Sequence, residues 1–432
     1  MTNEVEAGET GRTGPDTGAP SGPPTGRAPA ATVEFRHVSK RYDPGAKGPG
    51  AVNDLSMFVP AGRICVLVGP SGCGKTTSLK MVNRLIEPTS GQILIDGRDV
   101  MQEEATTLRR RIGYVIQQTG LFPHLTIGAN VAVVPGLLGW SPERRRQRTD
   151  ELLSLVGLEP ARYRDRYPAQ LSGGERQRVG VARALAADPP LMLMDEPFGA
   201  VDPIVRERLQ NEFLRLQEEL AKTILFVTHD IDEAIKMGNL VAVMQTGGLL
   251  AQFAPPDEIL ANPASEFVAR FVGTDRGLKR LSLARVGELE PIPPVVARAG
   301  EPVALVRPRM VDSRFGYVLL VDDESKPIGW IEFGGVPRDG SLDPALAVPA
   351  SPLVSRETTL KDALSMMLDA DVQAAIVVDR QGRVAGLITV DSVIERLRED
   401  RAHEDRVIAA PEAAPAVARC CSSSGSPKTW GS

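Results

Sequence analysis

Two glycine-rich segments and a pair of adjacent carboxylates have the residue types and spacing that phosphate chemistry requires. Residues 69–76 read GPSGCGKT and match the phosphate-loop pattern G-x-x-x-x-G-K-[ST] without a gap. Backbone N–H groups of such a loop wrap a β-phosphate, so we expect Lys75 to reach the β- and γ-phosphates and the Thr76 hydroxyl to hold Mg²⁺. This loop alone predicts only that the chain binds a nucleotide.

The second glycine-rich segment, residues 171–175, reads LSGGE. Ser172 and Glu175 form a capping-box pattern, which predicts a helix starting near Gly173. Since Gly173 and Gly174 have no side chains, N–H groups at the helix start can approach a phosphate, and the helix dipole favours an anion there. An isolated S-x-x-E only caps a helix. Because this helix start is followed shortly by a strand that ends in two acidic residues, the pair suggests an ATPase that closes on ATP between two copies of itself.

The adjacent carboxylates are Asp195 and Glu196, which follow the apolar run LMLM at residues 191–194. Open parallel sheets bind ligands at the carboxyl ends of their strands. Asp195 is placed to bind the Mg²⁺ shell through water. Glu196, one residue further, is the candidate to orient and polarise the attacking water.

The elements around the phosphate loop are those that the motif requires. Residues 64–68 are apolar and read as a buried parallel strand. Residues 77–86 have helical spacing of their apolar positions, Leu79, Val82 and Ile86. A strand, a glycine-rich loop and a helix in this order indicate an α/β fold of the phosphate-loop NTPase type.

In this order, over about residues 33–275, these motifs resemble the ATP-binding-cassette (ABC) transporter ATPases. The resemblance implies a RecA-like core with a helical subdomain and an antiparallel β subdomain. It implies that Tyr42 stacks on adenine, that Gln117 senses the γ-phosphate and Mg²⁺, and that His229 contacts the γ-phosphate. The loop at residues 199–202 would communicate across a dimer through Asp202, with Val201 where Leu is commoner.

The predicted site therefore comprises four sets of residues. The nucleotide-binding set is Tyr42, Gly69, Pro70, Ser71, Gly72, Cys73, Gly74, Lys75, Thr76 and Thr77. The catalytic set is Glu196, His229, Gln117 and Lys75, and the Mg²⁺ set is Thr76, Gln117 and Asp195. Ser172, Gly173, Gly174 and Glu175 would contact ATP that is held by the other copy.

Four further segments resemble the ATPases of bacterial glycine betaine, carnitine, choline and proline importers. They are residues 81–91, 120–126, 133–140 and 271–282. The resemblance implies an ATP-hydrolysing subunit for osmolyte import. Its partners would be a second copy, transmembrane permease subunits and, indirectly, an extracytoplasmic solute-binding protein. The substrate class rests on this resemblance alone.

Length and composition limit the other function classes. A chain of 432 residues with 42% hydrophobic content predicts more than one domain. The longest apolar candidate, residues 127–140, is interrupted and shorter than the ~18 residues of a membrane helix. Because the N-terminal residues do not resemble a secretory signal, we expect the protein to lie at the cytoplasmic face of the membrane. The net charge of −5 argues against general nucleic-acid binding, and the four cysteines lack metal-site spacing.

The expected organisation has five parts: a disordered tail over residues 1–31, the cassette over 32–275, a linker over 276–300, a smaller α/β region over 301–405 and a disordered tail over 406–432. Within the cassette, residues 118–170 would form the helical subdomain. In the family, this subdomain receives the permease's coupling helix.

The smaller region resembles a degenerate pair of CBS repeats. Its second copy, residues 353–398, shows an amphipathic helix at 359–368, strands at 374–378 and 384–389, and a helix at 391–398. The first copy is a half-copy at 317–333 whose upstream helix we expect Pro308 to break. Thr389 is followed at the family's spacing by Ser392 instead of Asp. This departure disfavours nucleotide binding and leaves a structural or ionic-strength-sensing role as an alternative.

Three other functions remain open. The chain could energise an ABC importer for another small solute, such as an amino acid. It could be a soluble ABC ATPase of translation or repair, although those usually carry two cassettes or a coiled-coil insert. It could also act mainly as a ligand-binding regulator through the CBS-like region.

Overall fold

The computed structural model describes residues 28–43, 50–116, 120–199, 202–311 and 316–398. Its first part is built on a six-stranded sheet in the order β10-β9-β3-β8-β7-β6, with β10 antiparallel to β9 and the other pairs parallel. The strands are β3 (Ile64–Val68), β6 (Ile112–Val115), β7 (Leu191–Asp195), β8 (Thr223–Val227), β9 (Leu240–Gln245) and β10 (Leu249–Ala254). Because helices and a second sheet cover its two faces, β3, β7 and β8 are buried along their whole length.

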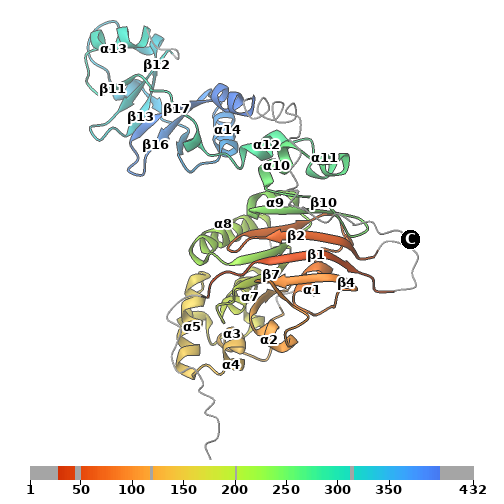
Figure 1. Ribbon diagram of the computed structural model, residues 1–432. Helices are drawn as coiled ribbons and strands as arrows, with labels where there is room; N and C mark the ends of the chain where they lie inside the picture. The colour runs from red at the N-terminus through yellow and green to blue at the C-terminus, as the bar shows by residue number, and fades with distance from the viewer. Residues whose placement is uncertain (1–27, 44–49, 117–119, 200–201, 312–315, 399–432) are drawn as a thin grey trace, which may run out of the picture.

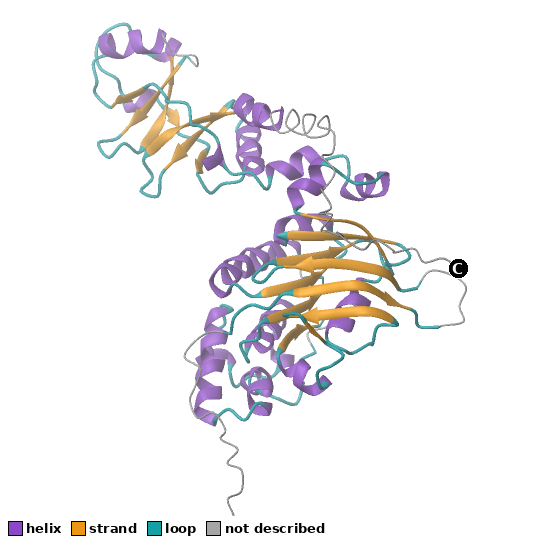
Figure 2. Cartoon of the chain, in the orientation of Figure 1, coloured by secondary structure: helices purple, strands orange, loops and turns teal. Residues whose placement is uncertain are grey.

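A second, antiparallel sheet covers one face of this core in the order β2-β1-β4-β5 (Figure 2). Its strands are β1 (Val33–Lys40), β2 (Val52–Val59), β4 (Ser90–Ile95) and β5 (Arg98–Asp99). Side-chain alternation along β3 explains the layering. Cys65 and Leu67 pack in the cluster that contains the second sheet, and Val66 packs in the cluster that contains the helices.

Most of the helices occupy the other face and the segment between β6 and β7, whereas the helix after the phosphate loop packs in the same cluster as the second sheet. That segment contains α3 (Ile127–Val131), α4 (Val133–Leu137), α5 (Pro142–Leu155), α6 (Pro160–Tyr163) and α7 (Gly173–Leu185). The remaining helices of the first part are α1 (Lys75–Val82), α2 (Ala105–Arg110), α8 (Pro203–Leu220), α9 (Ile231–Met237), α10 (Pro256–Ala261) and α11 (Glu266–Val272). Among the described residues, no helix is long and apolar enough to cross a bilayer.

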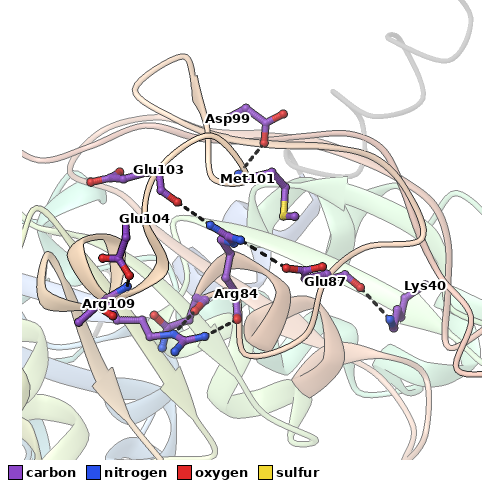
Figure 3. Close-up of polar contacts among 10 residues, drawn as sticks. Lys40, Arg84, Glu87, Asp99, Met101, Glu103, Glu104 and Arg109 are labelled. Carbon is purple, nitrogen blue, oxygen red and sulfur yellow. Dashed lines mark hydrogen bonds and ion pairs between the residues drawn. The ribbon is translucent and has the colours of Figure 1, made fainter.

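The helix after the phosphate loop is shorter than the apolar spacing predicts. It ends at Val82, whereas the sequence pattern extends to Ile86. Arg84 adopts a left-handed conformation with φ of 48°, which stops the helix. Arg109 of α2 then donates hydrogen bonds to the carbonyl oxygens of Asn83 and Arg84, just beyond the helix (Figure 3). Ile86 still packs against the core, but from the following loop.

The C-terminal part shows the same β-α-β-β order twice. The first unit comprises β11 (Val296–Arg298), α13 (Val303–Val311), β12 (Tyr317–Val321) and β13 (Pro327–Glu332), and β14 (Val348–Pro349) extends its sheet. The second comprises β15 (Leu353–Ser355), α14 (Leu360–Asp369), β16 (Ala374–Val378) and β17 (Val384–Thr389), followed by helical residues 390–398. In each unit the first two strands pair in parallel and the last two antiparallel.

A shared apolar cluster joins the two units. Leu319 and Val321 of β12 meet Ile376 of β16 and Leu387 of β17. Equivalent strands of the two copies therefore face each other across this cluster. In Figure 1 the pair lies at one end of the molecule, and α10 and α12 (Arg276–Leu281) lie between it and the cassette sheets.

Two expectations for this region are wrong. Pro308 does not break its helix, because α13 continues through it. The apolar face of Val303, Val306 and Met310 holds the helix on its sheet, and the Arg309 side chain donates to the carbonyl oxygen of Leu305. Residues 276–300 are also more than a linker, since they include α12 and β11, and α12 contacts both α10 and α14.

Candidate nucleotide-binding site

The phosphate loop joins β3 to α1 through a turn that only glycine fits. A Cβ atom on Gly69 would lie 2.1 Å from the carbonyl oxygen of Met244, and one on Gly74 would lie 2.3 Å from that of Ala51. Lys75, the first residue of α1, folds back over this loop. Its Nζ donates to the carbonyl oxygens of Gly69 at 2.7 Å and Pro70 at 3.0 Å. The ammonium group is therefore held at the centre of the loop, where phosphates are expected to bind.

The predicted Mg²⁺ residues Thr76 and Asp195 are brought together by the fold. The Thr76 hydroxyl donates to Oδ1 of Asp195 at 2.9 Å, although the two residues are 119 positions apart. Asp195 ends β7 and is buried, and burial raises its pKa above the ordinary value although the Thr76 bond opposes this. A hydroxyl and a carboxylate oxygen fit Mg²⁺, which takes few protein ligands and keeps waters and phosphate oxygens.

Glu196 and His229 meet beside this pair. Glu196 has φ of 45°, and its backbone N–H donates to the carbonyl oxygen of Val227 at 2.9 Å. This left-handed turn directs its side chain away from the course of β7. Nδ1 of His229 then lies 3.3 Å from Oε1 of Glu196. The two residues follow neighbouring strands, β7 and β8, so the sheet itself positions them together.

Tyr42 follows β1 and lies beside the start of α1, and its side chain is mostly exposed. Its hydroxyl lies 3.3 Å from Oγ1 of Thr77, and the Nζ atom of Lys40 lies 5.5 Å from the ring centroid. The contact with Thr77 therefore holds an exposed aromatic ring next to the phosphate loop. This geometry suits a planar base that stacks on the ring.

The capping box predicted at residues 172–175 is confirmed. The Ser172 hydroxyl accepts from the Glu175 N–H at 3.3 Å, and the Glu175 carboxylate accepts from the Ser172 N–H at 2.7 Å. Among the described residues, no hydrogen bond joins Ser172, Gly173 or Gly174 to Lys75 or Thr76. A Cβ on Gly173 would meet nothing within 4 Å, so the start of α7 is open to an approaching group.

Sequence reasoning missed Tyr163, which supports this capping box from α6. Its hydroxyl donates to Oε1 of Glu175 at 2.7 Å. This bond and the Ser172 N–H lower the pKa of Glu175 to about 2. The spacing of apolar residues does not reveal the role of Tyr163, because its contact with Glu175 depends on how α6 is placed beside α7.

Asp202 has a local role in capping a helix, and two other positions of the predicted motifs lie outside the described residues. Asp202 caps α8, since its Oδ1 accepts from the N–H of Ile204 at 3.0 Å. Gln117 and Val201 lie outside the described residues, as do most of the two tails that we expect to be disordered.

The fold and site define a phosphate-loop ATPase of the ABC class, and comparison with known proteins agrees. Residues 52–199 match the family model for the ABC transporter, and residues 347–399 match that for the CBS domain. A solved Clostridium perfringens structure, part of the ABC transporter complex cbiONQ, superposes with a TM-score of 0.50 and 25% identity. It covers 58% of this chain and 94% of its own.

Characterised relatives match nearly their whole length. The chain is 46% identical to the osmoprotectant import ATP-binding protein OsmV of Salmonella typhimurium, over 81% of this chain and 92% of the relative. It is 44% identical to the glycine betaine/carnitine/choline transport ATP-binding protein OpuCA of Bacillus subtilis, over 84% and 95%. It is 43% identical to the choline transport ATP-binding protein OpuBA of the same species, over 88% and 99%. The chain belongs to the family of ABC transporter ATP-binding proteins, which are ATPases coupled to transport.

Proposed function

We propose that this chain hydrolyses ATP to energise import of an osmolyte, either a quaternary amine such as glycine betaine, choline or carnitine, or proline. One observation carries the substrate class. Relatives named for the import or transport of osmoprotectant, of glycine betaine, carnitine and choline, and of choline match the chain at 43–46% identity over 81–88% of its length. By the same reasoning the protein acts at the cytoplasmic side of the membrane as a peripheral subunit.

In the proposed mechanism the phosphate loop holds the triphosphate of ATP. Lys75, released from its bonds to the Gly69 and Pro70 carbonyl oxygens, binds the β- and γ-phosphates. Thr76, Asp195 and Gln117 would hold Mg²⁺, which neutralises charge that develops on the phosphate oxygens. Tyr42 stacks on the adenine ring. The buried position of Asp195 keeps its oxygen next to the Thr76 hydroxyl.

Glu196 is the proposed base. Its left-handed backbone directs the carboxylate toward His229, and the 3.3 Å contact between them fixes a common side for the γ-phosphate. In this geometry the Glu196 carboxylate orients the attacking water and accepts a proton from that water. His229 contacts the γ-phosphate. A glutamine in place of Glu196 keeps the shape of the side chain and removes the proton acceptor.

The second copy completes each site. The open start of α7, with Ser172, Gly173, Gly174 and Glu175, would contact ATP held by the partner copy, and Asp202 would lie at the contact between copies. Closure of the two copies would drive the permease subunits. The solute-binding protein would act from the other side of the membrane.

The assignment of the base is tested by Glu196→Gln, with Glu207→Gln on the exposed side of α8 as control. We expect hydrolysis to fall at least ~10²-fold in Glu196→Gln with ATP binding retained, and to change less than about twofold in the control. Near-normal hydrolysis by Glu196→Gln would reject the assignment.

The substrate class is tested in vesicles that contain the assembled transporter. We expect glycine betaine to stimulate ATP hydrolysis by the wild-type protein. Stimulation by an amino acid such as glutamine, without any by glycine betaine, would favour an importer of another solute. A full ATPase rate in the absence of any permease would favour a soluble, non-transport role.

A further inference from the structure

A cavity of about 230 Å³ lies between the end of α5 and the middle of α7 and α8, on the helical side of the cassette (Figure 1). None of the residues that we assign to the nucleotide, to catalysis or to Mg²⁺ lines it, so it is separate from the phosphate loop. Its walls are mostly apolar and continue the core cluster that contains the helices. The apolar lining residues include Leu155, Val156, Val181, Phe198, Phe213 and Leu216.

One polar side chain in this apolar wall has an unused hydrogen-bond donor. Gln177 of α7 lines the cavity and is only 6% exposed. Its amide nitrogen, Nε2, is buried and has no hydrogen-bond partner among the described residues. Leaving a buried donor unpaired is unfavourable, and native structures nearly always supply an acceptor. The cavity has room for a molecule that brings this acceptor.

The charged residues of the cavity favour an anion. Arg178 also lines it, and the buried Nε of Arg178 has no hydrogen-bond partner in the described part of the chain. A Cβ on Gly157 would lie 3.4 Å from Nη1 of Arg178, which places this guanidinium beside the end of α5. The carboxylate of Glu212 in the same wall already accepts from Nε of Arg208 at 3.1 Å. With Arg215 also in the wall, an incoming carboxylate would meet an excess of positive charge.

Volume and wall chemistry limit what the occupant can be. A dry apolar cavity of about 150 Å³ holds benzene, whereas one water takes about 30 Å³. A cavity of about 230 Å³ therefore holds a ring with one substituent. Water could satisfy Gln177, but it would leave most of the volume against apolar walls where water finds no partners. Phe198 and Phe213 pack edge to face with their centroids 6.3 Å apart, and such a wall suits a flat ring.

We propose that this cavity is a binding site for a small aromatic monocarboxylate of about nine non-hydrogen atoms. Its carboxylate accepts a hydrogen bond from Nε2 of Gln177 and faces the guanidinium of Arg178. Hydrogen bonds to an ionised acceptor are shorter and stronger than neutral ones. Its ring packs on Phe198 and Phe213.

The occupant bridges α7 and α8 near the start of α7. Leu209 of α8 lines the cavity, and its Cδ1 atom lies 3.9 Å from a Cβ built on Gly174. The site is therefore distinct from the phosphate loop and lies close to the segment that we propose to contact ATP of the partner copy.

The test measures binding of 4-fluorobenzoate to the full chain by fluorine NMR, with saturating ADP and Mg²⁺ so that the phosphate loop is occupied. We expect a Kd below about 3 mM, which is within reach of a ligand of this size. The neutral isostere 4-fluorobenzamide should bind at least about fivefold more weakly, because it lacks the negative charge.

Three variants locate the probe. Gln177→Leu keeps the size of the side chain and removes the donor, so the Kd should rise about 10-fold or more. Gln147→Leu is the matched control and should stay within about twofold, because Gln147 of α5 bonds Glu151 at 3.1 Å and does not line the cavity. Leu216→Trp fills the cavity from α8 and should abolish measurable binding. The melting temperature of each variant reports whether it is folded.

Four results would overturn the proposal. A wild-type Kd above about 3 mM would show that only water occupies the cavity. Equal affinity in the wild type and Gln177→Leu, or in the wild type and Leu216→Trp, would place the probe elsewhere. Equal binding of 4-fluorobenzamide would reject the carboxylate. If Gln177→Leu does not fold, Leu216→Trp decides alone.

Discussion

The capping box at the start of α7 gives a prediction that can be worked from its geometry. Glu175 accepts hydrogen bonds from the Tyr163 hydroxyl and the Ser172 N–H, each at 2.7 Å. These bonds lower the pKa of Glu175 to about 2 from its ordinary 4.5. Such a difference corresponds to about 3 kcal/mol if unscreened. Because the side chain is partly exposed, water reduces this to about 1–2 kcal/mol.

Replacing Glu175 with Ala should therefore destabilise the cassette by about 2 kcal/mol, including the unpaired Tyr163 hydroxyl that it leaves. For a domain of this size the melting temperature should fall by about 4–8 °C. Circular dichroism of the nucleotide-free chain measures this change. Tyr163→Phe removes one bond only and should cost about half as much.

The pH dependence follows from the sign of the shift. Because the folded pKa of Glu175 lies below its unfolded value, the stabilisation is complete above about pH 4.5 and is lost as pH falls toward 2. Glu175→Gln should remove this part of the acid sensitivity. A Glu175→Ala chain that melts within 1 °C of wild type would refute the reasoning. Fully additive losses of stability in the Tyr163→Phe/Glu175→Ala double variant would also refute it, because two residues that share a hydrogen bond should not act independently.

Two further outcomes are expected. Gly69→Ala should destabilise the cassette by at least about 3 kcal/mol in urea unfolding, because its Cβ would lie 2.1 Å from the Met244 carbonyl oxygen. Gly72→Ala meets nothing within 4 Å and should cost only the ~1–2 kcal/mol of its left-handed backbone, so equal losses would contradict this account. Lys222→Met should cost about 3–5 kcal/mol, since the buried Lys222 ammonium pairs with Asp188 at 2.9 Å. The exposed pair of Lys236 and Glu207 supplies the control, and Lys236→Met should change stability by less than about 1 kcal/mol.

Local patterns were predictable wherever the interacting residues are close in the chain. The capping box of α7 was read correctly because Ser172 and Glu175 are one helical turn apart. The strands β3, β16 and β17 and the start of α14 at Thr359 were also placed correctly from periodicity and caps. In each case the pattern that reveals the element, a cap or an apolar period, is written in residues that are close together in the chain.

Errors arose where distant residues decide. The end of α1 depends on Arg109, which lies 25 residues after Arg84. The helix through Pro308 persists because its apolar face packs against a sheet of β11, β12 and β13, of which the sequence pattern predicted the last two strands but not β11. The support of Glu175 by Tyr163 depends on how α6 is placed beside α7.

The sequence by itself determined that this chain binds and hydrolyses a nucleotide, since the phosphate loop and the strand that ends in Asp195 and Glu196 are contiguous motifs with local geometry. Only the tertiary structure decided how these motifs meet. It brought the Thr76 hydroxyl to Asp195 across 119 positions, turned Glu196 toward His229, and joined the end of α1 to α2 through Arg109. Those contacts depend on the order of strands in the sheet and on side chains that reach between elements. Neither the strand order nor these side-chain contacts can be recognised from the spacing of residues in the sequence.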